Sequence, residues 1–358
     1  MNVSALDDLE SYPRLDPSGL RHRLLDFPDQ CRRAWREASE FALSLDVGHC
    51  KQVLVTGMGG SAIGGDLLAD LASTSPTVPI IVIRGYRVPY ILDQDTLVLS
   101  CSYSGNTEET LATFQQASSQ GAPIVAISSG GTLGQEAQAR SIPFFQINYQ
   151  GEPRSALGYS FIVPAVLLAK LGLLDSESIG FEDAFAAVDS LLPTLSENVP
   201  SMENPAKQLA QALLDRLIVV YGSGIYSGVS RRWKTQFNEN SKVPAYFESL
   251  PEAHHNAVVG LSLPDAVKEL TTAILLEPYD ISPPMARRYE VTRELLDRDS
   301  IPHHTIRGVD GSPLAQMITT TLIGDYTSYY LAILQGVDPS PVNSIAYIRQ
   351  RMGQPYQD

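Results

Sequence analysis

The stretch Gln52-Val-Leu-Val-Thr-Gly-Met-Gly-Gly-Ser61 sets a short apolar run directly before a glycine-rich turn. Such a run, bounded by a turn, is typical of a strand that is buried on both faces. Similar runs recur along the first half of the chain, with helical patterns between them, at 80–83, 96–100, 123–127 and 143–147. Apolar strands that alternate with helices indicate a parallel sheet covered by helices on both faces.

The pattern restarts in the second half of the chain. Leu217-Ile-Val-Val-Tyr-Gly-Ser-Gly224 echoes the opening block, and we expect further strands at 257–261 and 272–276. The chain is therefore predicted to be an α/β protein with two related domains. The first domain, with the N-terminal helices, is expected to span 1–185. The second is expected to span 186–358 and to end in a C-terminal helix.

Length and composition agree with two globular domains. The chain has 358 residues, and 40 acidic residues against 26 basic ones leave a net charge of −14. This acidity argues against a nucleic-acid partner, because nucleic acids are bound by basic surfaces. The N-terminal residues do not resemble a signal peptide, no apolar run is long enough to cross a bilayer, and the three cysteines lack metal-ligand spacing. We expect a cytoplasmic protein without a membrane partner.

Two loops at the ends of predicted strands carry phosphate-binding chemistry. Glycines let backbone N–H groups approach a phosphate, and a helix N-terminus adds partial positive charge. Serine and threonine hydroxyls donate to phosphate oxygens without a lysine. The two loops together are best explained by one phosphorylated ligand, whose candidate ligating residues are Gly59, Gly60, Ser61, Ser102, Ser104 and Thr107.

Two other interpretations of these loops stay open. The first loop also fits a dinucleotide fingerprint loosely, but such a domain needs an acidic residue after its second strand, where this chain has Arg84. The hydroxyls of the second loop also suit ordinary turn and helix-capping chemistry.

Candidates for proton transfer lie in the second half of the chain. Glu239 is predicted at a helix end in an apolar neighbourhood, and it is a suitable base if burial raises its pKa. His254 and His255 stand together on a predicted loop, and either one is a candidate acid or base. The pair His303 and His304 is expected to be structural. No histidine has the spacing of a zinc site.

At these positions the chain resembles the bifunctional phosphoglucose/phosphomannose isomerase family, whose members consist of two sugar-isomerase (SIS) domains in tandem. The resemblance runs over nearly the whole chain. Its anchors are Gly57-Met-Gly-Gly-Ser61, Ser102-Tyr-Ser-Gly-Asn-Thr-Glu108, Glu152-Pro-Arg154, Glu239-Asn-Ser-Lys242, Glu252-Ala-His-His-Asn256 and the helix after Asp338-Pro339. It implies three-layer αβα domains of SIS type, with parallel flavodoxin-like sheets and an active site between the two domains.

The resemblance also implies a reaction. It implies that the chain interconverts glucose 6-phosphate and mannose 6-phosphate with fructose 6-phosphate through a cis-enediolate, without a metal or other cofactor. Glu239 matches the base that moves the proton between C1 and C2. His255 matches the acid/base that opens the sugar ring, which the partner chain of a homodimer contributes. Arg154 matches the arginine that stabilises the enediolate, since a guanidinium offers paired donors to an oxyanion.

One position departs from the family pattern. Arg349 stands where the family has a lysine that assists ring opening, and an arginine stays protonated, so it can orient an oxygen but cannot pass on a proton. Lys242 is interpreted as a structural or site-edge charge. This change leaves open a phosphosugar-binding regulator that has lost or altered its activity. A related tandem-SIS enzyme that acts on amino sugars is a separate alternative.

Overall fold

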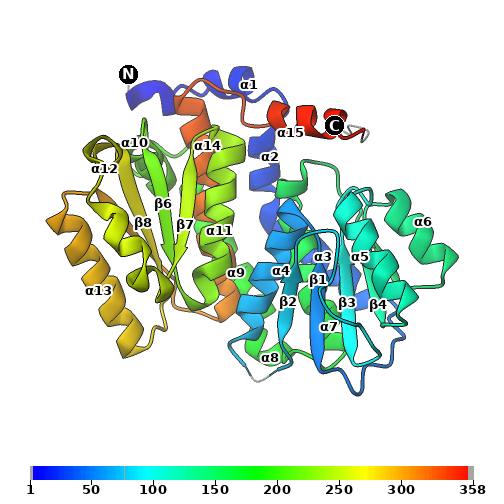
Figure 1. Ribbon diagram of the computed structural model, residues 1–358. Helices are drawn as coiled ribbons and strands as arrows, with labels where there is room; N and C mark the ends of the chain where they lie inside the picture. Colours follow the sequence, from blue (N-terminus) through cyan, green and yellow to red (C-terminus); the bar gives the residue numbers. More distant parts are fainter. Residues whose placement is uncertain (1–2, 76, 354–358) are drawn as a thin grey trace. The chain divides into compact units, whose positions relative to one another are not determined.

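The computed structural model describes residues 3–75 and 77–353, and within them the chain forms two compact units (Figure 1). One unit runs from Asp26 to Ile179. The other consists of the residues up to Leu25 together with those from Gly180 onward. In this division the residues up to Leu25 belong with the later part of the chain, whereas the sequence pattern predicts them in a domain spanning 1–185.

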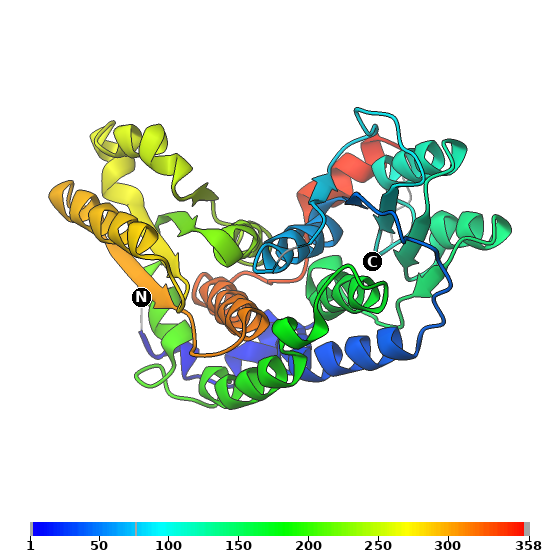
Figure 2. The same ribbon diagram turned by 90° about the horizontal axis from the view of Figure 1, so that it is seen from below.

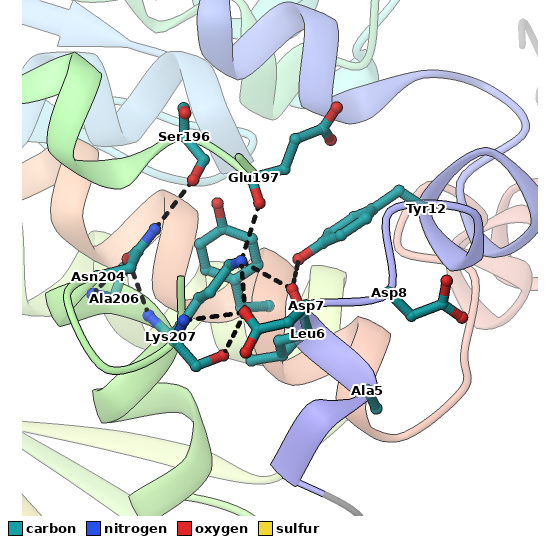
Figure 3. A network of polar contacts seen from close by, with 12 residues as sticks. Ala5, Leu6, Asp7, Asp8, Tyr12, Ser196, Glu197, Asn204, Ala206 and Lys207 are labelled. Atoms are coloured by element: carbon teal, nitrogen blue, oxygen red, sulfur yellow. Dashed lines mark hydrogen bonds and ion pairs between the residues drawn. The ribbon is translucent and has the colours of Figure 1, made fainter. Parts of the chain in front are cut away.

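A buried lysine holds the N-terminal segment in the second unit (Figure 3). The Lys207 ammonium donates to the carbonyl oxygens of Leu6, at 2.7 Å, and Glu197, at 2.9 Å, and pairs with Asp7 at 3.3 Å. The Tyr12 hydroxyl donates to the same Leu6 oxygen at 2.7 Å. These contacts join the chain start to a helix about 200 residues later, so the N-terminal segment is part of that unit's core.

The sheet of the first unit has five parallel strands in the order β2-β1-β3-β4-β5. This order is the flavodoxin-like one that the family resemblance implies, and the five predicted strands agree with the observed ones to within two residues at each end. Their bounds are β1 Gln52–Thr56, β2 Ile80–Ile83, β3 Thr96–Cys101, β4 Ile124–Ser128 and β5 Phe144–Gln146.

Helices cover both faces of this sheet. Phe114 of α5 (Glu108–Ser119) and Leu133 of α6 (Gly131–Ala139) share a buried cluster with Leu54 and Val98 of the strands. On the other face, Gly65 of α4 packs so closely on β1 that a Cβ would lie 2.8 Å from Val55 Cγ1. Beyond α4 (Gly59–Ala72) lie the π-helical turn η3 (Gly158–Ile162), α3 (Phe27–Glu40) and α7 (Val163–Lys170).

The sheet of the second unit has four parallel strands in the order β7-β6-β8-β9. The strands are β6 (Leu217–Gly222), β7 (Ala245–Ser249), β8 (Thr271–Glu277) and β9 (His303–Arg307). Figure 1 shows α13 (Pro283–Arg298) and α11 (Ser227–Gln236) on opposite faces of this sheet. The prediction of a second, related α/β domain is confirmed.

Helix α14 (Pro313–Leu334) is the centre of the second unit. It packs against α11, α9 (Phe181–Leu195) and α10 (Pro205–Ala212), as Figure 2 illustrates. Because it is surrounded, nearly all of its residues are buried, including its threonines. The remaining elements are η1 (Val3–Leu6), α1 (Ser11–Leu15), α2 (Leu20–Leu25), α8 (Ser176–Ile179), α12 (Asp265–Leu270) and α15 (Asn343–Arg351).

The prediction of a strand at 257–261 is wrong. These residues form the 3-10 segment η7 (Ala257–Leu261), none of whose side chains is buried, and Val259 is 81% exposed. The Asn256 side chain accepts from Ala257 N and so begins a turn. The strand at one edge of the second sheet is β7, most of whose residues are only partly buried.

Candidate active site

Both hydroxyl-bearing loops leave the same edge of the first sheet. They follow β1 and β3, which pair in parallel with Thr56 opposite Ser100. The strand order reverses between β1 and β3, since β2 lies outside β1 and β4 outside β3. At such a switch point the loops after the strands separate, and open α/β sheets bind their ligands there.

The first loop is packed against the second by small residues. A Cβ on Gly57 would lie 2.8 Å from the carbonyl oxygen of Cys101, so only glycine fits between the two strand ends. The Ser61 hydroxyl accepts from Tyr103 N at 3.3 Å, which links the loops directly. Helix α4 begins at Gly59, and its N-terminus supplies partial positive charge at this point.

The second loop gathers its hydroxyls around one turn. Ser102 Oγ and Thr107 Oγ1 share a hydrogen bond of 2.9 Å, and Ser102 Oγ also accepts from Gly105 N at 3.1 Å. Ser104 Oγ accepts from Asn106 N at 3.2 Å. Helix α5 starts directly after Thr107, so a second helix N-terminus points into the same region.

Gly105 allows this turn to form. Its φ is +70°, which favours glycine, and a Cβ there would overlap the carbonyl oxygen of Gly130.

The loop after β4 supports the second loop, although none of its residues was among the predicted site residues. Ser129 Oγ donates to the Tyr103 carbonyl at 2.7 Å, and Thr132 Oγ1 donates to Asn106 Oδ1 at 3.1 Å. The signal that identifies it is the run Ser128-Ser-Gly-Gly131 directly after a predicted strand. Three successive strand ends therefore build one polar region.

Arg154 belongs to a short 3-10 turn, η2 (Pro153–Ser155), that packs on the first loop. A Cβ on Gly60 would lie 2.9 Å from the carbonyl oxygen of Pro153 and 3.5 Å from Cα of Arg154. Arg154 itself is only 4% exposed. The fold thus brings this buried cation to the beginning of α4, together with the residues predicted to bind phosphate.

Glu239 lies in the second unit, on a π-helical turn, η5 (Phe237–Ser241), that ends α11. Such turns are frequent at functional sites. Helix α14 holds this one, since Asn240 Nδ2 donates to Ser328 Oγ at 3.0 Å and Ser241 Oγ donates to the Ser328 carbonyl at 2.7 Å. Glu239 is half-buried.

Lys242 closes the turn that carries Glu239. Its backbone is left-handed, with φ of +59°, an uncommon conformation for a lysine. Its ammonium donates to the Glu239 carbonyl and, at 3.0 Å, to the Pro339 carbonyl. These bonds tie the turn to the segment that leads into α15, the helix that contains Arg349.

His255 lies in the 3-10 turn η6 (Glu252–His255), where it is exposed. Glu239 comes before β7 and His255 comes after it, so the two residues lie at opposite ends of this strand. Five strand residues extend over about 16 Å. The fold therefore does not bring Glu239 and His255 of one chain together.

The switch point of the second sheet, between β6 and β8, is filled by a tyrosine. Tyr289 of α13 is fully buried; its hydroxyl donates to the Leu276 carbonyl at 2.5 Å, and its oxygen lies 3.1 Å from Ser223 Oγ. Burial raises the pKa of Tyr289. In the first sheet the hydroxyl-bearing loops flank the switch point. In the second sheet the Tyr289 side chain fills the corresponding place.

Metal sites and membrane-spanning helices are both absent from the described part of the chain. Over residues 3–75 and 77–353, no group of three or more histidine, cysteine or acidic side chains is arranged to hold a metal ion. Within the same ranges, no helix has both the length and the apolar character needed to span a membrane.

Comparison with known proteins gives consistent matches. Residues 202–352 match the family model for the bacterial phospho-glucose isomerase C-terminal SIS domain. A bifunctional phosphoglucose/phosphomannose isomerase from Caldicellulosiruptor bescii is 36% identical, over 92% of this chain and 97% of that protein. One from Aquifex aeolicus is 32% identical, over 87% of this chain and 93% of its own length.

Solved structures match the fold. A hypothetical protein from Thermus thermophilus superimposes with a TM-score of 0.71, covering 97% of this chain and 94% of that one, at 18% identity. At this identity the likeness concerns the fold alone.

Proposed function

The chain belongs to the bifunctional phosphoglucose/phosphomannose isomerase family, and from this premise we propose that it interconverts glucose 6-phosphate and mannose 6-phosphate with fructose 6-phosphate. The observation that carries the proposal is the polar region of the first sheet. There, hydroxyls from two strand ends are linked through Ser61 and Tyr103, with the buried Arg154 alongside.

The sugar phosphate is bound by these hydroxyls and by two helix N-termini. Each hydroxyl can rotate its proton from a protein acceptor to a phosphate oxygen, so the bond between Ser102 and Thr107 is exchanged for bonds to the ligand. A dianion held in this way needs no lysine cluster. This explains how a chain with a net charge of −14 can bind one.

The isomerisation itself is a proton transfer by Glu239. Its carboxylate takes the proton from C2 of the open-chain aldose, and the electrons form the C1–C2 double bond of the enediolate. The proton then returns to C1, while the hydroxyl proton passes from O2 to O1 and the ketose carbonyl forms at C2. Arg154 stabilises the negative oxygen of the intermediate, because its guanidinium remains charged and offers several donors. The half-buried place of Glu239, on a turn held by Lys242, supports this role.

Ring opening requires an acid/base at the other end of the sugar, and we assign it to His255 of the partner chain in a homodimer. Two observations support this. Strand β7 separates His255 from Glu239 within one chain. The residues that follow His255 also form an exposed apolar surface, with Val259 81% and Leu263 74% exposed, as is usual where a second molecule binds.

Arg349 takes the place of the family lysine in α15, and we assign it the positioning of a substrate oxygen rather than proton transfer.

No metal or other cofactor enters the reaction. The thiols of Cys50 and Cys101 form no disulfide, which supports a reducing, cytoplasmic location.

The proposal is tested by incubating the purified chain with fructose 6-phosphate in deuterated water containing EDTA. We expect glucose 6-phosphate and mannose 6-phosphate to form, with deuterium at C2. Glu239→Gln should abolish both product formation and deuterium exchange, while the variant still binds the substrate. Binding without turnover by the wild-type chain would instead favour the regulatory alternative.

A further inference from the structure

The two adjacent histidines of the turn η6 have different surroundings. His255 is exposed, whereas the ring of His254 is half-buried and held by two side chains of α13. His254 Nε2 lies 2.9 Å from Thr292 Oγ1, and His254 Nδ1 lies 3.2 Å from Arg288 Nη1. Both ring nitrogens therefore have partners on the same helix.

These partners determine where the ring carries its proton. The Thr292 hydroxyl donates its hydrogen to the Arg288 carbonyl, at 2.8 Å, so its oxygen accepts from His254 Nε2. The Arg288 guanidinium has only donors, so Nδ1 must accept. Only the neutral ring with hydrogen on Nε2 satisfies all three bonds.

The charges around the ring favour the same form. Burial lowers the pKa of His254, and so do Arg288 of α13 and His255 of its own turn, each of which is a cation when protonated. The other acidic or basic residue of this turn, Glu252, is exposed and accepts from Asn256 Nδ2 at 2.5 Å. A second proton on His254 would set Nδ1–H against the Arg288 donors and break that contact.

We propose that His254, in its neutral form, is a positioning residue that ties the turn η6 to α13 and thereby holds His255 in place. The turn has only four residues, and the buried methyl of Ala253 anchors its other side. The role rests on the proposed function of His255. When acid protonates His254, the turn loses its bond to α13 and ring opening slows.

Three variants test the role of His254 through kcat and KM for fructose 6-phosphate, measured between about pH 5 and 8. His254→Ala should lower kcat about tenfold with little change in KM, because the phosphate is bound elsewhere. His254→Gln keeps a donor for Thr292 but cannot titrate, so it should retain more activity and lose part of the acid-side decline. His303→Gln, in the other histidine pair, is the matched control and should behave like the wild type.

A measurement independent of activity is the nitrogen-15 NMR spectrum of the histidine rings. His254 should be the Nε2–H tautomer, and its pKa should lie below about 6.5, the usual value for a histidine. The inference is overturned if His254 is the Nδ1–H tautomer, or if His254→Ala matches the wild type in kcat and pH profile while His255→Ala is inactive. Failure of the proposed function would look different: the wild type would show no turnover, or His255→Ala would be fully active, and His255 would then need no positioning.

Discussion

Glu239 and His255 lie at opposite ends of strand β7, although only sixteen positions separate them in the sequence. The strand is extended over about 16 Å and runs in one direction, so it separates the two groups within one chain. If both act in the same reaction, they act as parts of two chains. This arrangement leads to a direct test of the dimer.

Mixed dimers should recover activity that neither parent has. Glu239→Gln and His255→Ala are each expected to be inactive, but a mixed dimer has one site with an intact glutamate from one chain and an intact histidine from the other. With random pairing, half of the dimers are mixed and half of their sites are complete, so about a quarter of wild-type activity should return. The measurement is turnover after the two variants are unfolded and refolded together. Recovery close to zero, with dimers present, would contradict the shared site.

Removing one loop hydroxyl should weaken phosphate binding without unfolding the loop. Ser102→Ala deletes the Oγ that pairs with Thr107, but Gly105 N keeps its bond to the Ser102 carbonyl at 3.0 Å. A hydrogen bond to a charged group contributes about 1.5–3 kcal/mol, so KM and the inhibition constant of inorganic phosphate should rise at least about tenfold. Ser119→Ala, at the far end of α5, is the control. Equal KM values for the two variants would exclude Ser102 from the phosphate site.

Two glycines with the same backbone conformation separate the effect of strain from that of close packing. Gly105 and Gly121 have φ of +70° and +75°, but a Cβ on Gly105 would overlap Gly130, whereas nothing lies within 4 Å of one on Gly121. Gly121→Ala should cost about 1 kcal/mol of unfolding free energy, and Gly105→Ala about 3 kcal/mol or more. Urea denaturation measures both. Gly105→Ala should also lose phosphate binding, which Gly121→Ala should retain.

Loss of the buried lysine should release the N-terminal segment. Lys207→Met leaves the carbonyl oxygens of Leu6 and Glu197 without the ammonium and should lower the unfolding free energy by about 2–4 kcal/mol. Limited proteolysis should then cleave before Leu25 first. Lys268→Met removes a partly exposed pair with Asp265 and should change stability by less than about 0.5 kcal/mol. Similar stabilities of the two variants would show that Lys207 does not anchor the chain start.

The same cluster gives stability a pH dependence. Hydrogen bonds from Ser201 and Lys207 outweigh the opposing effect of desolvation and lower the pKa of Asp7 in the folded chain. The unfolded state then binds more protons, so this contribution is complete above pH of about 4, the usual pKa of an aspartate, and is lost as the pH falls through the lower folded value. Asp7→Asn should therefore flatten the acid side of a plot of thermal midpoint against pH. An unchanged slope would contradict the role of Asp7.

Sequence patterns predicted the strands of the first sheet well and β7 of the second sheet poorly. The middle residues of β1 and β3 are continuously apolar because both faces of these strands are covered, and this leaves an unambiguous pattern. β7 is partly exposed and contains polar residues, so its sequence has no clear strand pattern. The more apolar run at 257–261 is therefore predicted to be a strand instead. The local sequence pattern does not distinguish an apolar run on the surface from one in the core.

The sequence by itself determined which chemical groups are present: two hydroxyl-bearing loops after apolar strands, a glutamate and a pair of histidines. It also identified an arginine, Arg154, through the resemblance to the family. It also determined the two-domain α/β class, because that follows from local patterns of apolar residues. Tertiary structure alone decided which groups meet. Strand pairing sets Ser61 beside Tyr103, the direction of β7 keeps Glu239 from His255, and α13 distinguishes His254 from its neighbour. Such relations depend on strand order and packing between distant segments, which no local pattern encodes.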